Sequence, residues 1–369
     1  MSPYILIYLN FIFNDAIPFL FFYPDVPENI QYTTFTAAII NLSFLFLFRK
    51  QAQVPISINL PLSSIKLNKK RKILLSCFVF FLLWAGVMSG VLINLLRGNN
   101  IEDLRRTSEI GVGVIRDIPM LGIQIIMLVL FLQKTWKCYY KVVAFYSFCL
   151  SVFLFLTTGN KGGVLVGVTL FLLFFHLKKR GFKWYEYVLY YLAMPLAAGT
   201  LQGIRGGDLT LIASQIAVFF SYPVILYQAN SIPIMNAVGT ENFFWGEEYY
   251  TGLVKFIPRF LWPDKPLSFD YKLKELANYD FEGGGIYTTL CNDLYINFGY
   301  YYFIFYILWL LFIHYLYGMV MDDKRFYYSR IIALFIILMG GIASTIGSCE
   351  ILLLFLLFLI LYYSRVKTL

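Results

Sequence analysis

Four basic residues lie at the ends of apolar stretches long enough to cross a bilayer, and three of them lie directly beside glycine or proline. Arg116 lies in Val-Ile-Arg-Asp, Lys161 in Gly-Asn-Lys-Gly-Gly, Arg205 in Ile-Arg-Gly-Gly and Arg259 in Ile-Pro-Arg-Phe-Leu-Trp. A charge at a membrane boundary is costly to place, so such residues are candidates for function. Arginine binds phosphate bidentately and always stays charged. This group is expected to bind a phosphate-class anion; the alternative for each residue is a snorkelling or capping role.

The segment 202–290 is of mixed polarity and lies between apolar stretches. Directly after Arg259 it continues Phe-Leu-Trp-Pro-Asp-Lys-Pro, which contains Trp262 and Lys265. Aromatic residues are dense in this segment beside asparagine and acidic residues, a composition suited to sugars as well as to simple packing. We expect the segment to be a large external loop that carries the chemistry.

Several common catalytic motifs are absent from the sequence. It has no P-loop, no GxGxxG, no HExxH and no GxSxG. Its two histidines, His176 and His314, fall near the predicted cytoplasmic ends of helices. The pair Glu247-Glu248 is weak evidence for a metal site, since neighbouring carboxylates on a surface are common. We therefore expect neither a metal nor a cofactor.

The composition is that of an integral membrane protein. Hydrophobic residues make up 59% of the chain and charged residues 14%, against about 25% charged residues in soluble domains. We predict an all-α, polytopic fold forming a single membrane domain over 1–369. About ten membrane helices are expected, at 3–23, 31–48, 73–96, 114–132, 142–158, 162–177, 187–203, 295–318, 330–346 and 350–364.

The net charge of +9 is a topology signal. Of the 30 Lys and Arg residues, 19 fall in alternate loops and the C-terminal tail. By the positive-inside rule these loops and both termini are cytoplasmic, and 202–290 is external. Nucleic-acid binding is therefore not expected. Residues 211–229 are apolar enough to form an eleventh span, which would give a topology of eleven or twelve spans. We favour instead an interfacial or re-entrant helix for these residues.

Three motifs carry a resemblance to a known family. They are the run from Ile257 to Pro266, the segment Asn292-Asp293-Leu-Tyr295-Ile-Asn297-Phe-Gly299, and the tight polar break Thr-Thr-Gly-Asn-Lys161-Gly. Together they resemble the oligosaccharide repeat-unit polymerases, the Wzy-type O-antigen and capsular polysaccharide polymerases. The family usually has Arg at the break, where this chain has Lys161, and often has Glu where this chain has Asp293.

The resemblance implies a GT-C-like fold and metal-independent, inverting glycosyl transfer at the outer face of the bacterial cytoplasmic membrane. The substrates would be undecaprenyl-pyrophosphate-linked glycans, and a chain-length regulator and a flippase would be partners. Arg205 and Arg259 would bind the pyrophosphates, helped by Lys161 and Lys265. Asp293 or Asp208 would position or deprotonate the acceptor hydroxyl. Further substrate-binding residues would be Arg116, Trp262, Tyr295 and Asn297.

Two other functions are compatible with a chain of this kind. A polysaccharide ligase would be expected to use an external histidine, and none is found. A flippase or transporter of lipid-linked oligosaccharide would place polar and charged residues inside several spans. The predicted spans are largely apolar, although Asn10, Asn14, Asp15 and Asn41 lie in the first two.

Overall fold

The computed structural model describes part of the chain, and every regular element within this part is helical. It describes residues 3–48, 185, 196, 199–200, 212–221, 224–225, 227–254, 257, 261–266, 269–279 and 288–318. The predicted helices at 73–96, 114–132, 142–158, 162–177, 330–346 and 350–364, and nearly all of 187–203, lie outside these residues. The chain divides into two compact units. The described residues of one are 3–48 and 221–318, whereas α12 (Ile212–Phe220) belongs to the other.

The first predicted span, 3–23, is a helical segment with a π-helical section in its middle. It consists of α1 (Pro3–Phe11), the π-helix η1 (Ile12–Ala16) and α2 (Ile17–Phe22). Pro18 lies in the first turn of α2. Proline cannot donate to the preceding turn and its ring clashes with that turn, and the wider π section lies just before it. A second π-helix, η4 (Tyr227–Ser231), similarly precedes Pro233 in α14 (Ile232–Val238).

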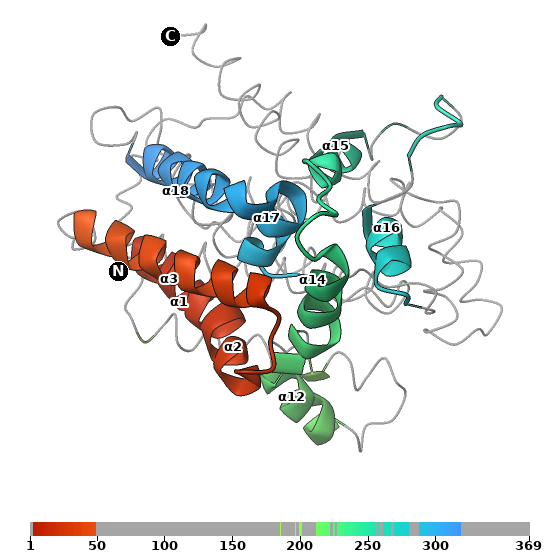
Figure 1. The fold of residues 1–369 in the computed structure, drawn as a ribbon. Helices are drawn as coiled ribbons and strands as arrows, with labels where there is room; N and C mark the ends of the chain where they lie inside the picture. Colours follow the sequence, from red (N-terminus) through yellow and green to blue (C-terminus); the bar gives the residue numbers. More distant parts are fainter. Residues whose placement is uncertain are drawn as a thin grey trace, which may run out of the picture. The chain divides into compact units, whose positions relative to one another are not determined.

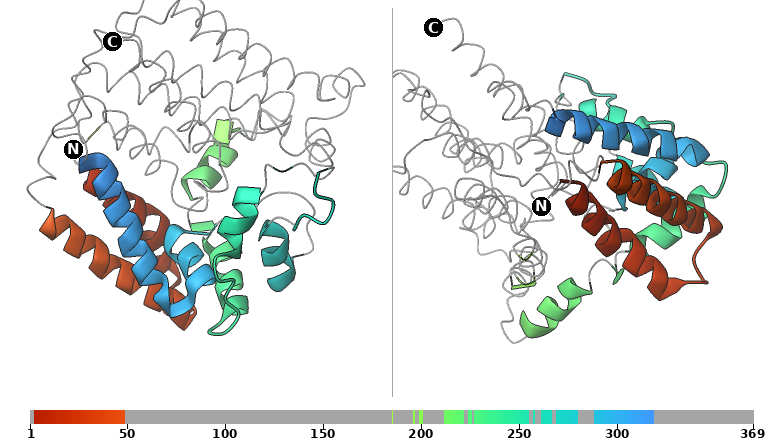
Figure 2. Two further views of the ribbon diagram at one scale, coloured as in Figure 1. Left: turned by 90° about the horizontal axis from the view of Figure 1, so that it is seen from above. Right: turned by 90° about the vertical axis from the view of Figure 1, so that its left-hand side faces the viewer.

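The second predicted span, 31–48, corresponds to α3 (Glu28–Leu47). One face of α3 is buried, with Ile30, Thr33, Ala37, Asn41 and Phe44 at helical spacing. This face packs against α17 (Leu290–Phe298) and α18 (Tyr302–Gly318). The three helices lie side by side in both views (Figures 1 and 2).

Hydrogen bonds join α3 to these two helices. The Tyr302 hydroxyl donates to the Thr33 carbonyl at 2.7 Å. The amide of Asn41 and the hydroxyl of Tyr306 are paired through contacts of 2.8 and 3.1 Å. Polar side chains thus occupy the interior of the bundle, where each needs a partner.

The predicted helix at 295–318 corresponds to the helical segment of α17, η5 (Gly299–Tyr301) and α18, which differs from the prediction in two respects: it begins earlier, at Leu290, and it is interrupted at Gly299. Thr289 caps the start of α17, and Gly299 ends it with φ +57° and ψ −139°. The 3-10 turn η5 then leads into α18. A β-carbon at Gly299 would lie 2.6 Å from the Phe243 ring. Glycine is therefore required here both by the backbone conformation and by the close approach of an aromatic ring.

Two short helices lie on the side of α17 away from α3. They are α15 (Glu247–Val254) and α16 (Phe269–Leu276), and they contact each other (Figure 1). The Phe244 amide donates to the Ile296 carbonyl at 3.1 Å, which joins the start of this region to the end of α17. The described part of 202–290 is therefore a set of short helices.

Two helices in the described part of the chain are long and apolar enough to cross a membrane by length and composition: Glu28–Leu47 and the α17–α18 segment Leu290–Tyr315. Large apolar side chains are exposed along both. They include Phe35, Ile39, Leu42, Phe46 and Leu47 on α3 and Leu308, Leu311, Phe312 and Tyr315 on α18. Polar residues inside and apolar residues outside are the arrangement expected of helices that face lipid.

Candidate functional site

Asp293 lies in the first turn of α17, with 2% of its surface exposed. The helix begins there because Thr289 adopts an extended conformation and its hydroxyl accepts from the Asn292 amide at 3.4 Å. A carboxylate in the first turn is favoured by the helix dipole. The sequence thus holds a buried carboxyl group at a fixed position on the α17 face that points towards α15.

Three side chains surround this carboxyl group. Asn297, one turn along α17, donates from Nδ2 to Glu248 Oε2 at 2.8 Å and to the Asp293 carbonyl at 3.0 Å. The Tyr249 hydroxyl donates to Asp293 Oδ2 at 3.4 Å. The Glu248 and Asp293 carboxyl groups are close enough to act on each other electrostatically. We call Glu248, Tyr249, Asp293 and Asn297 the carboxyl cluster.

Two neighbouring carboxyl groups influence each other's ionisation. Two ionised carboxylates close together repel, so a proton on one of them is favoured. Asp293 is almost fully buried, whereas Glu248 is half-buried and is the more accessible member. Such a pair can accept a hydrogen bond from a hydroxyl group and take its proton.

Tyr249 serves this cluster as a neutral donor. Its burial, together with the nearby charges of Asp293 and Glu248, raises the pKa of its phenol well above the usual value. Its ring stacks on Phe298 of α17, with ring centroids 5.8 Å apart. The phenol therefore keeps its proton and donates a hydrogen bond to Asp293.

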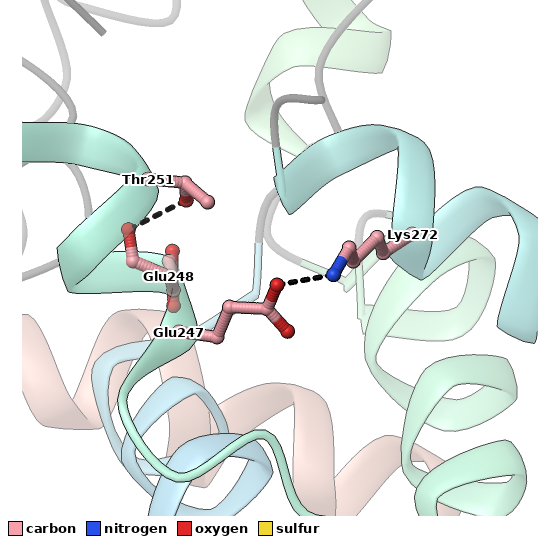
Figure 3. Close-up of polar contacts among 4 residues, drawn as sticks. All are labelled: Glu247, Glu248, Thr251 and Lys272. Atoms are coloured by element: carbon pink, nitrogen blue, oxygen red, sulfur yellow. Dashed lines mark hydrogen bonds and ion pairs between the residues drawn. The ribbon is translucent and has the colours of Figure 1, made fainter. Parts of the chain in front are cut away.

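A separate ion pair fixes the start of α15 against α16. Lys272 of α16 reaches Glu247, whereas the neighbouring Glu248 points to a different side (Figure 3). The Thr251 hydroxyl donates to the Glu248 carbonyl at 2.9 Å and closes the first turn of α15. The two adjacent glutamates thus have different tasks: Glu247 holds two helices together, and Glu248 joins the carboxyl cluster.

Two residues predicted to bind substrate, Tyr295 and Asn297, are fully buried. Tyr295 lies edge-on to Phe243, Tyr32 and Tyr300, and its hydroxyl donates to the Gly239 carbonyl at 3.2 Å. These are the contacts of a core residue. Asn297, in contrast, holds the carboxyl cluster together, and its own Oδ1 atom has no hydrogen-bond partner.

Trp262 and Lys265 lie in a turn that closes on itself. The Lys265 amide donates to the Trp262 carbonyl at 3.2 Å, and Lys265 Nζ donates to the Ile257 carbonyl at 2.9 Å. Trp262 is half-buried and the adjoining Leu261 is 67% exposed. The lysine thus anchors the turn that follows Arg259.

Five of the predicted site residues lie outside the described residues. They are the four cations and one of the two candidate carboxylates: Arg116, Lys161, Arg205, Arg259 and Asp208. Of the predicted residues, the structure brings Asp293 and Asn297 together in one site. Their roles, and those of the other predicted residues, stay predictions.

Sequence reasoning missed Glu248 and Tyr249. Glu248 was treated with Glu247 as one surface pair, because nothing in the spacing separates the two. The pairing of Glu248 with Asn297, 49 positions away in the chain, depends on tertiary packing alone.

No group of three or more histidine, cysteine, aspartate or glutamate side chains that could hold a metal ion occurs among the described residues. The carboxyl cluster has two carboxyl groups, one amide and one phenol. The arrangement is suited to hydroxyl groups and proton transfer.

No family model, curated protein or solved structure matches this chain.

Proposed function

We propose that this protein is a membrane glycosyltransferase that polymerises undecaprenyl-pyrophosphate-linked oligosaccharide repeat units at the outer face of the bacterial cytoplasmic membrane. The observation that carries the proposal is the carboxyl cluster, in which Asp293 and Asn297 of the family-like segment meet Glu248. A repeat-unit polymerase must activate a sugar hydroxyl, and a half-buried carboxylate backed by a buried carboxyl group suits that task.

In this proposal Glu248 contacts the acceptor and Asp293 acts behind it. The acceptor hydroxyl oxygen attacks the anomeric carbon of the donor, and its proton passes to Glu248. The bond between that carbon and the pyrophosphate oxygen breaks, and the configuration inverts. Asp293 carries the proton that stabilises the charge of Glu248, and Tyr249 donates a hydrogen bond to Asp293. The departing pyrophosphate needs cations, a role we assign to Arg205 and Arg259, helped by Lys161 and Lys265.

The membrane setting is supported by the polarity of the described helices. The apolar exposed faces of α3 and α18 suit lipid, and their buried faces carry the polar residues. We propose a multi-pass protein with cytoplasmic termini.

The directions of the described helices agree with the proposed topology. The start of α1, the end of α3 and the end of α18 meet: the Tyr4 and Phe48 rings lie 5.6 Å apart, and those of Phe48 and His314 4.1 Å apart. The basic loops predicted to be cytoplasmic, 49–72 and 319–330, follow these two helix ends. If α3 and α18 both cross the membrane and end on the same side, the chain between them has to cross the membrane an odd number of times. Five predicted spans satisfy this, and a sixth at 211–229 would not.

The proposal is tested by comparing two neighbouring glutamates. Glu248→Gln removes the proton acceptor but keeps the shape, and general-base catalysis is worth about 10²–10⁴-fold in rate. Expressed in a deletion strain of the native host, this variant should leave glycans of a single repeat unit. The measurement is the glycan length distribution on gels, normalised to the protein level in the membrane.

Glu247→Gln is the matched control. It removes the same charge one residue away but breaks only the pair with Lys272, a partly exposed ion pair of the kind that contributes about 0–1 kcal/mol. This variant should make polymer of normal length. Normal polymer from Glu248→Gln at a normal protein level would disprove the catalytic role.

A second candidate function is transport of a lipid-linked oligosaccharide. The observation that favours it is the buried Asp15, 5% exposed, together with the buried Asn41 on the neighbouring helix. Intramembrane polar residues of this kind line substrate or ion paths in transporters. Loss of a flippase would leave no repeat units outside the membrane, whereas loss of a polymerase would leave single units there.

A further inference from the structure

A group of aromatic side chains lies where α17 meets α18. Tyr295 is at its centre and fully buried, and three rings lie edge-on to it with centroids 5.5, 5.7 and 6.5 Å away, those of Phe243, Tyr300 and Tyr32. Trp245 extends the group, since its ring lies 6.1 Å from that of Phe243. We call these five residues the aromatic cluster.

The outer members of the aromatic cluster are exposed. Trp245 is 67% exposed and Tyr300 48%, and the adjoining Tyr301 is 59% exposed. The chain beneath them is tied down, because the Tyr32 hydroxyl donates to the Tyr300 carbonyl at 3.3 Å. Large exposed apolar surfaces of this kind mark sites of interaction with a membrane or another molecule.

The backbone of Trp245 shows that its exposure is built into the fold. Its φ is +50°, a left-handed conformation that bulky residues rarely adopt, and Gly246 follows with φ +84°. The preceding Phe244 packs edge-on against Phe269, with ring centroids 4.9 Å apart. A strained conformation persists only where the surrounding structure holds it, and such residues gather at functional sites. The turn thus keeps one tryptophan exposed at a cost in backbone strain.

The exposed residues on either side of the aromatic cluster differ in polarity. Beyond Tyr301, as far as the third turn of α18, the exposed side chains are apolar: Ile304, Phe305, Leu308, Leu311 and Phe312. In the opposite direction, one turn before Tyr32 and just before Phe243, they are polar or charged: Glu28, Glu241 and Asn242. The order apolar, aromatic, charged is that of a membrane surface, where Trp and Tyr rings gather at the headgroups. Each of these side chains combines an apolar ring with one polar atom.

We propose that the aromatic cluster lies among the lipid headgroups of the outer leaflet and holds the carboxyl cluster at that depth. The inference rests on the membrane topology of the proposed function. Trp245, the most exposed member, is the main anchor. The apolar surface on one side and the charged residues on the other favour lipid over a glycan or a protein partner, because neither of these requires that order.

α17 joins the aromatic cluster to the carboxyl cluster. Tyr295 of the first and Asp293 of the second are two residues apart, so their side chains leave the helix about 200° apart. In the segment that packs on α17, Trp245 and Glu248 are three residues apart, so their Cα atoms are at most about 11 Å apart. A backbone hydrogen bond to α17 just before Trp245 fixes this segment. Because a headgroup layer is about 5–8 Å deep, Glu248 is held at the membrane surface.

This depth suits the proposed reaction. The bond that breaks joins a sugar to the pyrophosphate of a lipid carrier. The carrier chain lies in the hydrocarbon, so that bond lies among the headgroups. A base held at the same depth meets the acceptor hydroxyl beside the bond to be broken, while the rest of the glycan extends into water.

The test is fluorine NMR of the full-length protein, labelled with fluorotryptophan, in lipid nanodiscs. The signal missing in Trp245→Phe identifies Trp245 among the six tryptophans. Relaxation is measured with a nitroxide on the lipid headgroup, a nitroxide at the end of the acyl chain, or a water-soluble gadolinium chelate. The headgroup nitroxide should relax the Trp245 signal several-fold more than either of the others. The measurement needs no enzymatic activity, so its failure and the failure of the proposed function are distinguishable.

Trp309 is the control within the same sample. It lies eight residues beyond Tyr301 on α18, which is about 12 Å further along the helix. The signal missing in Trp309→Phe identifies it. The nitroxide at the chain end should relax this signal more than the headgroup nitroxide does.

Tyr250→Trp tests the depth of the carboxyl cluster. Tyr250 is 50% exposed and lies two residues after Glu248 on α15. The substitution therefore adds a signal next to the carboxyl cluster without changing any of its members. The headgroup nitroxide should relax the added signal as well.

Three results would overturn the proposal. Stronger relaxation of Trp245 by the soluble chelate would place the aromatic cluster in water, where it would serve a glycan or a protein. Stronger relaxation by the chain-end nitroxide would place it inside the hydrocarbon. An added signal in Tyr250→Trp that responds to the soluble chelate alone would mean that the two clusters lie at different depths.

Discussion

Glu248 and Asp293 form one pair, but their different exposure gives them different parts in the proposed reaction. Asp293 is 2% exposed and cannot meet a glycan without rearrangement, whereas Glu248 is half-buried at the start of α15. Asn297, one turn beyond Asp293 on α17, fixes their geometry because its side-chain amide donates both to Glu248 and to the Asp293 carbonyl. The reactive group and its support therefore come from different helices, and one amide side chain sets the distance between them.

Asn297→Ala should destabilise the protein by about 1–3 kcal/mol, because it removes the partner of a partly buried carboxylate. It should also shorten the glycan, since Glu248 loses its position. Thermal unfolding and glycan length check the two effects. The control is Asn242→Ala, an exposed residue whose amide makes one 3.4 Å hydrogen bond to the Ala237 carbonyl. Equal effects of the two substitutions would contradict the bridging role of Asn297.

The helix elements differ in how far the sequence predicts them. The predicted span 31–48 agrees with α3 to within a few residues, because a long apolar run between polar ends defines it. The π-helix in 3–23 and the break at Gly299 were missed, since hydropathy does not report a local change of helical pitch. The motif singled out Asp293 and Asn297, whose roles stay predictions. It did not single out Glu248, because only the packing of α15 on α17 separates it from Glu247.

The break at Gly299 offers a test at this scale. Gly299→Ala forces a side chain into an unfavourable backbone region, which costs about 1–3 kcal/mol, and also drives a β-carbon into Phe243. Gly239→Ala is the matched control: its φ is +58°, but its β-carbon would be 3.9 Å from the nearest atom. Gly299→Ala should therefore lower the melting temperature more than Gly239→Ala does.

Removing the obstacle should restore part of that loss. In the double variant Gly299→Ala, Phe243→Leu, the added β-carbon meets a smaller side chain and only the backbone strain remains. The melting temperatures of the three variants are measured. If Gly299→Ala and Gly239→Ala lower the melting temperature equally, and the double variant shows no recovery, then Phe243 does not restrict position 299.

At the scale of the whole molecule, the described helices make a bundle with polar residues inside and apolar residues outside. The ends of α3 and α18 lie together, and both precede loops rich in Lys and Arg. The carboxyl cluster, built on the start of α17, belongs to the opposite end of the α17–α18 segment. In the proposed topology that end is external, where lipid-linked glycans are found after export.

A reporter fused after Asp280 tests this arrangement. The fusion point lies in the segment 202–290, which we expect to be external. A periplasmic phosphatase fused there should be active, and a fusion at the end of α18 should be inactive. An inactive phosphatase after Asp280 in a stable fusion would reverse the proposed topology.

The most direct measurement of the central claim is the glycan made by the native host when this gene is deleted. Polymerisation fails in the absence of a polymerase, but export and transfer to the final acceptor continue. We predict surface glycans that carry one repeat unit each, with no longer species, and restoration of the full length distribution by the native protein. Polymer of normal length in the deletion strain, or the absence of any surface repeat unit, would contradict the proposal.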